Sequence, residues 1–300
     1  MPMTDLTVLL QSPELNAQLV VDGMLAGAIF ALAAYGMALV WGVMNLINVA
    51  QGELVMLGGY MVIWLVGRGV PAPLAVPLAA AAMYAVGWAL YRIVIFRLVE
   101  RDLFVSLLAT FGLSIVLQQL ANLVFGANVR TLDAGFGSLF LPGGLVVPKV
   151  KLAAFAAALA LGAALMLFLR HSRRGQAIRA TAQNARAARV LGVDTDRVYA
   201  TTFALNAAIC GAAGGLVAMT WIIHPYLGLP YTVRAFMIVV VAGLGSMLPV
   251  LGAAGGLGIA ENYAGFLLGV EYQTAFLYAL LVAILVSRNL MLRRHRGYLR

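Results

Sequence analysis

The sequence predicts an all-α polytopic membrane protein with eight to nine transmembrane helices, some of them short or broken. Hydrophobic residues make up 63% of the 300 residues, charged residues only 10%, and the mean hydropathy is +0.96. A soluble chain could not keep so much apolar surface away from water. Residues 23–52 and 198–233 hold no Asp, Glu, Lys or Arg and are long enough to cross a bilayer. The basic residues stand at the ends of such runs, as orientation in a membrane requires.

The apolar runs give the expected spans in chain order. The first span ends at a polar interruption, Met44–Glu53, and the second span is short. A glycine- and proline-rich stretch, Gly67–Pro73, predicts the turn before the third span. We expect spans at about Leu19–Met44, Leu54–Val66, Leu74–Phe96, Leu103–Phe125, Leu152–Leu169, Val198–Ile222 and Tyr272–Ser287.

Two further stretches are expected to depart from straight helices. Gly126–Lys151 contains GFGSLFLPGG, and its glycines and proline predict an irregular loop. Ala235–Ala260 contains GLGSMLPVLGAAGGLG, which predicts a pair of short or broken helices. If both members of the pair cross the membrane, the chain crosses it nine times.

The distribution of basic residues predicts the orientation. Of the 20 Lys and Arg residues, 15 fall near Arg97, between Arg170 and Arg197, or from Arg288 onward. Short loops rich in Lys and Arg stay in the cytoplasm. We therefore expect these three regions to be cytoplasmic, with the N-terminus outside and the C-terminus cytoplasmic.

Arg173–Arg197 is the one long polar segment. Gln176–Leu191 lacks proline and glycine and predicts one short helix, with Gly192 as its stop and Asp194 as the cap of the next span. We expect the small or apolar face to hold Ile178, Ala182 and Ala185, and the next face to hold Arg179, Gln183 and Arg186. A helix lying on lipid would carry bulky apolar residues, so the alanines favour docking on protein.

Polar residues among the spans are candidates for a translocation pathway. Asn45, Asn48 and Gln51 are spaced three apart, so one helical turn could place them on one side, and Glu53 follows. The alternative is that these side chains only cap and tie helices by hydrogen bonds. Glu261 either lines the pathway or is a structural carboxylate at an interface.

Small residues and absent motifs further limit the possible functions. The lone Cys210 is expected to be a small core residue, and no metal site is expected. No GxxxxGK[ST] motif is present, so the chain is not expected to hydrolyse ATP. No protease motif supports an intramembrane enzyme, and nucleic-acid binding is not expected. Close helix contacts are expected at Gly23, Gly27, Gly58, Gly59, Gly211, Gly214, Gly215, Gly252, Gly255 and Gly256.

Three blocks in order along the chain resemble one known family. They are YGMALVWGVMNLINVAQGELVMLGGY (Tyr35–Tyr60), GQAIRATAQNARAARVLGVDTDRV (Gly175–Val198), and GLGS followed by GIAEN (Gly243–Asn262). Together they are similar to the LivH-type permeases of branched-chain amino acid ABC importers. The chain departs from the family pattern at Gln51, where His is usual, and at Met247-Leu248-Pro249, where Pro-Gly follows Gly-Ser.

The resemblance implies a single permease domain over residues 1–300 in the bacterial inner membrane, with a cytoplasmic coupling segment at about residues 171–197. It implies a second related permease, two cytoplasmic ATPase subunits that bind ATP and Mg, and a periplasmic substrate-binding protein. The ATPase-coupling residues implied by the resemblance are Arg174, Gly175, Ile178, Arg179, Ala182, Asn184, Arg186, Arg189 and Gly192.

The expected function is therefore import of small polar solutes, with branched-chain or other hydrophobic amino acids as first choice. Amides, urea and small carboxylates stay open, because selectivity in such importers lies largely in the binding protein. The alternative is a stand-alone secondary transporter or channel, which broken helices fit equally well. That alternative leaves the docking segment unexplained.

Overall fold

The computed structural model describes residues 9, 11–99, 101–132, 137–140, 144–243 and 247–297, without the side chains of Met247 and of residues 289–297. Its α-helices are α2 (Pro13–Met44), α3 (Gln51–Gly67), α4 (Ala72–Ile93), α5 (Leu103–Phe125), α6 (Lys149–His171), α7 (Arg173–Gln183), α8 (Ala185–Val190), α9 (Thr195–Thr220), α10 (Gly228–Ala242), α11 (Met247–Leu268) and α12 (Gln273–Gly297). Two 3-10 turns, η1 (Ile95–Arg97) and η2 (Val270–Tyr272), and two short strands, β1 (Ser138–Phe140) and β2 (Val146–Pro148), complete the described chain.

The all-α polytopic membrane fold is confirmed. In the described part of the chain, 6 helices are long and apolar enough to cross a membrane. They are Pro13–Met44, Ala72–Arg97, Leu103–Phe125, Lys149–His171, Thr195–Thr220 and Val270–Arg288. Two shorter apolar helices, α3 and α10, lie among them. The number of crossings and the orientation of the termini stay predictions.

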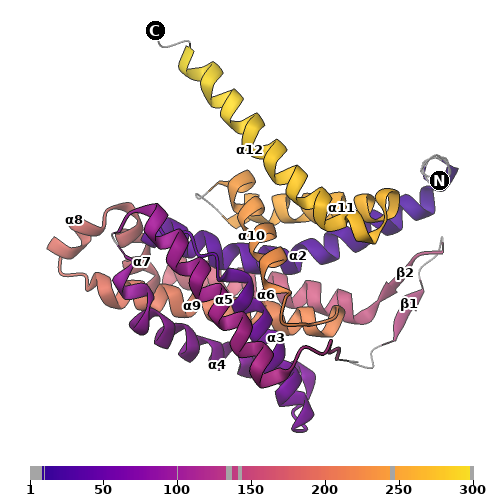
Figure 1. Cartoon of the computed structure of the whole chain (residues 1–300), viewed down its shortest axis with the longest axis horizontal. Coiled ribbons are helices and arrows are strands. Elements are labelled where there is room, and N and C mark those ends of the chain that lie inside the picture. Colours follow the sequence, from indigo (N-terminus) through magenta and orange to yellow (C-terminus); the bar gives the residue numbers. More distant parts are fainter. Residues whose placement is uncertain are drawn as a thin grey trace.

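Helices α2 and α9 form the centre of the bundle. In the most apolar window of α2, 89% of residues are buried, and in that of α9 78% are, against 22% in α5 and 6% in the α12 region. Helix α2 packs along α11, and α9 packs along α3 and α4. Figure 1 shows α12 leaving the bundle at its side, while α7 and α8 lie at one end and β1 and β2 at the other. We call these the basic end and the hairpin end.

Backbone contacts between glycines hold α2 against α11. A Cβ atom added to Gly27 would lie 2.5 Å from the carbonyl oxygen of Ala254, and one added to Gly23 would lie 2.5 Å from the Cα atom of Ile259. On the α11 side, a Cβ atom at Gly258 would lie 2.2 Å from the Gly23 carbonyl oxygen. Only a residue without a side chain fits at these positions.

The expectation of close contacts at glycines is confirmed for the first seven positions and for Gly255, whose Cα atom would lie 2.7 Å from a Cβ atom added to Gly27, and it is wrong for Gly252 and Gly256. Cβ atoms added to Gly58 and Gly214 would collide with the backbones of α9 and α3. A Cβ atom added to Gly252, Gly255 or Gly256 would meet nothing within 4 Å. Gly252 and Gly256 are exposed, on a face of α11 that none of the described residues covers.

The two short helices begin next to each other inside the bundle. A Cβ atom added to Gly52 would lie 1.7 Å from the carbonyl oxygen of Gly228, so the first turns of α3 and α10 touch through their backbones. Farther along α3, Tyr60 stacks on Phe125 at the end of α5, with ring centroids 4.4 Å apart. Farther along α10, Phe236 stacks on Trp41 near the end of α2, at 5.7 Å. The two helices therefore lead from this contact toward opposite ends of the bundle.

The stretch Gly126–Lys151, expected to be an irregular loop throughout, contains a small hairpin instead. Strands β1 and β2 pair antiparallel, with Leu139 opposite Val147. Val147 is buried, and Gln18 of α2 bonds the backbone of Val146 at 2.9 and 3.1 Å. The hairpin forms because these contacts fix it on α2, which the sequence pattern alone does not reveal. The prediction for residues 133–136 and 141–143 lies outside the described residues.

We predict that Gly27→Ala lowers the free energy of unfolding by about 1–3 kcal/mol, because α2 and α11 must move apart to admit the methyl group. Gly256→Ala is the matched control on α11, and it should leave stability unchanged or slightly raised. Thermal unfolding of the two purified variants in detergent measures the difference. Equal melting temperatures would contradict the packing assigned to Gly27.

Candidate functional site

The polar interruption between α2 and α3 is held inside the bundle by two threonines. Thr110 of α5 accepts a hydrogen bond from the Val49 amide at 3.2 Å, and its Oγ1 lies 3.0 Å from the Ile47 carbonyl oxygen. Thr232 of α10 donates to the Val49 carbonyl oxygen at 2.9 Å and accepts from the Gly52 amide at 2.8 Å. Backbone groups that leave a helix inside a membrane need such partners.

Next to this interruption, Gln51 ties three helices together. Its Nε2 atom lies within hydrogen-bonding distance of the Ala33 carbonyl oxygen (2.8 Å), Asn206 Oδ1 (2.9 Å) and Cys210 Sγ (3.1 Å). Asn48 Nδ2 donates to Gln51 Oε1 at 3.2 Å. All four side chains are buried, and the expectation that Cys210 is a core residue is confirmed. We call Asn48, Gln51, Glu53 and Asn206 the polar centre.

Glu53 is the one acidic member of the polar centre. Its side chain is 1% exposed, and Ser114 of α5 donates to its Oε1 at 3.2 Å. A Cβ atom added to Gly228 would lie 2.2 Å from the carboxyl carbon, so the carboxyl group rests against the start of α10. Glu53 Oε2, Asn48 Oδ1 and Asn206 Nδ2 are buried without a hydrogen-bond partner. The centre thus has unused polar atoms where α3 and α10 meet.

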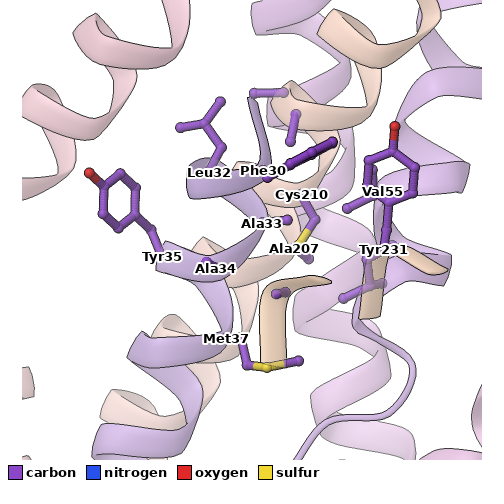
Figure 2. Close-up of a cluster of buried hydrophobic side chains, with 14 of the residues drawn as sticks. Phe30, Leu32, Ala33, Ala34, Tyr35, Met37, Val55, Ala207, Cys210 and Tyr231 are labelled. Carbon is purple, nitrogen blue, oxygen red and sulfur yellow. The ribbon is translucent and has the colours of Figure 1, made fainter. Parts of the chain in front are cut away.

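An apolar cluster adjoins the polar centre, since it contains Ala33 and Cys210, two of the hydrogen-bond partners of Gln51. Figure 2 shows Phe30, Ala33 and Met37 of α2 together with Cys210 of α9 and Tyr231 of α10. Phe30 packs edge-on against Tyr231, with centroids 5.8 Å apart. This arrangement places a few polar groups next to a buried apolar cluster.

The expected grouping of Asn45 with Asn48 and Gln51 on one helical turn is wrong. Residues 45–48 are not helical, because Asn45 ends α2 with a left-handed φ of 50°. Its side chain is exposed and lines a separate cavity of about 380 Å³ with Arg101 and Asp102. Asn48, Gln51 and Glu53 do come together in space, while Asn45 stays apart from them.

Glu261 lies outside the polar centre, in a buried ion pair with Arg234. Arg234 Nε lies 2.9 and 3.1 Å from the two carboxylate oxygens, and the two side chains are 16% and 3% exposed. The guanidinium also lies over the rings of Phe30 and Tyr231, at 5.0 and 5.1 Å. The pair therefore joins α10 and α11 to α2. This geometry agrees with the structural alternative for Glu261.

The polar segment after α6 folds as two helices rather than the single helix expected. Asn184 interrupts it with an extended backbone, and the Asn184 side chain accepts a hydrogen bond from the Ala187 amide at the start of α8. Ser172 caps α7 and Asp194 caps α9 in the same way, so the cap predicted at Asp194 is confirmed. Gly192 ends α8 with φ of 86°, as predicted. A side-chain cap at Asn184 competes with helix continuation, which propensity does not show.

The buried face of α7 also differs from the expected one. Gly175, Ile178 and Thr181 are buried, whereas Ala182 is exposed and Ala185 of α8 is half-buried. Ile178 packs with Leu39 of α2 and Val198 of α9, and a Cβ atom at Gly175 would lie 2.4 Å from the Phe168 carbonyl oxygen. Ile178 and Ala182, four residues apart on α7, still occupy neighbouring positions, but burial follows Gly175, Ile178 and Thr181, and Ala182 stays exposed one residue before the end of the helix at Gln183.

The remaining coupling candidates lie on the surface of the basic end. Arg174, Arg179 and Arg186 are exposed, and Arg189 Nε donates to Thr195 Oγ1 at 3.0 Å. Beside them, Val190 and Leu191 are 83% and 84% exposed at the end of α8. We call Val190 and Leu191 the apolar tip. An exposed apolar pair among arginines is typical of a surface that contacts protein.

Several site residues gave no sequence signal. Thr110, Asn206 and Thr232 are single polar residues in apolar helices, where such residues commonly bond their own backbone. Arg234 is one of the five basic residues outside the three regions predicted to be cytoplasmic, and its pairing with Glu261 was not foreseen. Its nearness to the glycine-rich block that ends in Glu261 was the only hint. Within the described residues, no group of three or more His, Cys, Asp or Glu could hold a metal ion.

Comparison with known proteins finds one family. The family model described as branched-chain amino acid transport system / permease component matches residues 19–285. The high-affinity branched-chain amino acid transport system permease protein LivH of Escherichia coli K12 is 30% identical over 285 residues, which cover 88% of this chain and 91% of that protein. The corresponding permease BraD of Pseudomonas aeruginosa is 27% identical over 286 residues, covering 90% and 93%. No solved structure matches.

We predict that Arg234→Met lowers the free energy of unfolding by about 3–5 kcal/mol, because it leaves the buried Glu261 carboxylate without its partner. The double variant Arg234→Met/Glu261→Leu should be clearly more stable than Arg234→Met alone. Lys151→Met is the control, since it breaks the more exposed pair with Asp22 and should cost about 0–1 kcal/mol. Unfolding in detergent measures all three. A double variant as unstable as the single one would contradict the pairing.

Proposed function

The chain belongs to the family of branched-chain amino acid transport system permease components, and we propose that it is the membrane-spanning subunit of an ATP-driven importer. Branched-chain or other hydrophobic amino acids are the proposed substrates, because the relatives are named as branched-chain amino acid permeases. Their similarity covers about nine-tenths of this chain. The observation that carries the proposal is the exposed apolar tip among arginines at the basic end. It offers an ATPase subunit a surface to hold.

The proposed assembly contains this chain, a second related permease, two ATPase subunits that bind ATP and Mg, and a periplasmic substrate-binding protein. The basic end then faces the cytoplasm of a bacterium, and the hairpin end faces the periplasm. The charge distribution supports this orientation, because most of the arginines lie at the basic end or in the tail. The chain itself would bind no nucleotide and hydrolyse none.

Docking through α7 and α8 is supported by the way their residues are divided between a buried face and an exposed face. Gly175 and Ile178 face the chain's own core and fix the segment on α6, α2 and α9. Arg179, Ala182 and Arg186 face outward. In this proposal the buried residues hold the segment in place and the exposed ones contact the ATPase.

The polar centre is the proposed closing point of the translocation pathway. Two short helices begin there and lead toward opposite ends, which is how broken helices meet at transport sites in membranes. Gln51 has its hydrogen bonds satisfied and serves to hold α2, α3 and α9 together. Glu53 and Asn48 keep unpaired oxygens that a passing polar solute could use.

A stand-alone secondary transporter or channel is the second candidate, and the meeting of α3 and α10 fits it equally well. It gives no role to the ordered α7–α8 segment or to its exposed apolar tip. Dependence of uptake on ATP and on separate ATPase subunits separates the two candidates.

We predict that the charge reversals Arg179→Glu/Arg186→Glu weaken capture of the cognate ATPase subunits by at least about tenfold, because they place acidic groups on the proposed contact face. Arg68→Glu, an exposed arginine between α3 and α4, is the control and should leave capture unchanged. Co-purification from membranes provides the measurement. Normal capture by the double variant, or uptake without any ATPase subunit, would overturn the proposal.

We predict that Glu53→Gln lowers the ATP-dependent uptake rate by about tenfold or more while ATPase capture stays normal. The change keeps the shape of the side chain and the bond from Ser114 but replaces the carboxyl group and its unpaired oxygen by an amide. Asp102→Asn, an exposed carboxylate before α5, is the control and should transport normally. Uptake measured in proteoliposomes decides the matter, and a fully active Glu53→Gln variant would show that the carboxylate has no part in the pathway.

A further inference from the structure

A cavity of about 460 Å³ lies at the basic end, between α4, α7 and α9. It is distinct from the polar centre and from the apolar tip. Its walls carry three arginines, two aromatic side chains and several small residues. They are Tyr84, Trp88 and Arg92 of α4, Arg174, Ala177 and Ile178 of α7, and Arg197, Val198, Ala200 and Thr201 of α9.

The charge of this cavity is one-sided. Arg92, Arg174 and Arg197 line it, and among the described residues no acidic side chain does. Asp194 and Asp196 are the near acidic groups: Asp194 pairs with Arg197 Nε at 3.0 Å on an exposed surface, and Asp196, the residue before Arg197, is exposed. Arg92 lies over the Trp88 ring at 5.2 Å. Planar guanidinium groups in this arrangement suit a phosphate group.

The surface beside the cavity is apolar. Leu74, Leu78 and Trp88 are 59%, 50% and 46% exposed on one face of α4, a helix long enough to cross the membrane. Tryptophan and tyrosine are common where a membrane protein meets the headgroup layer. The cavity therefore places arginines at headgroup depth, with an apolar surface leading into the hydrocarbon region.

We propose that this cavity binds the phosphate headgroup of an anionic phospholipid, whose acyl chains lie along the exposed face of α4. Basic pockets between membrane helices recognise lipid headgroups by this combination of charge and apolar surface. A soluble anion would gain from the arginines but not from the apolar face. The bound lipid would tie α4 and α9 to α7, so that lipid composition influences the position of the docking segment.

The test uses the full chain purified in detergent, with phosphatidylglycerol or phosphatidylcholine of identical acyl chains added. Native mass spectrometry counts the bound lipid. We expect phosphatidylglycerol to bind at least about tenfold more tightly, and Arg92→Gln/Arg197→Gln to remove that preference. Arg92→Lys/Arg197→Lys should retain most of it, because the charge is kept.

Arg68→Gln is the matched control, because Arg68 also lies over a tryptophan, Trp64, at 4.4 Å, but far from this cavity. It should bind phosphatidylglycerol as the unaltered chain does. Equal binding of the two lipids, or an unchanged preference in Arg92→Gln/Arg197→Gln, would overturn the proposal. Displacement by inorganic phosphate at equal concentration would assign the cavity to a free anion, and displacement by an added ATPase subunit would assign it to a protein contact. None of these readouts depends on transport, so their failure leaves the proposed function untouched.

Discussion

The structure depends on one constraint, that backbone groups freed by an interrupted helix must find partners inside the bundle. Between α2 and α3, Thr110 and Thr232 supply these partners. Their hydroxyl groups form hydrogen bonds with the backbone of Ile47, Val49 and Gly52. These bonds draw α5 and α10 onto the same few residues. Because the interruption is held in place, Gln51 and Glu53 stand at the start of α3 and inside the bundle. The polar centre thus results from the hydrogen bonds that the interrupted backbone requires.

Backbone contact between helices makes room for this centre. Helices that touch through glycines approach each other closely without side chains between them. Helix α2 meets α11 in this way at Gly23 and Gly27, and α3 meets α9 at Gly58 and Gly214. The bulkier side chains are left to the periphery, where α5 exposes Phe104, Leu108 and Leu123. Such faces are suited to lipid or to a second permease, as are the uncovered glycines of α11.

Features that depend on composition and local signals could be predicted from the sequence. Features that depend on contacts between residues far apart in the sequence could not. The bounds of α5 were predicted to the residue, because the apolar run is flanked by Asp102 and Gly126. The break at Asn184 was missed because a residue suited to a cap looks the same as one inside a helix. Ala182 was expected on the packed face with Ile178, but it lies one residue before the end of α7 and stays exposed beside the buried Thr181. Asn206 gave no sequence signal, because its role depends on a hydrogen bond with Gln51, which is far away in the sequence. The pair of Arg234 with Glu261 likewise required the packing of α10 on α11.

Helix α9 gives the basic end a mechanical link to the polar centre. It begins at the Asp194 cap, next to α8, and reaches Asn206 after about 18 Å of helix. Helix α9 is continuous over this distance. Any load applied at Val190 and Leu191 would therefore act on the hydrogen bond between Asn206 and Gln51, and through it on the contact of α3 with α10. In this molecule one helix segment separates the exposed end of α8 from the polar centre.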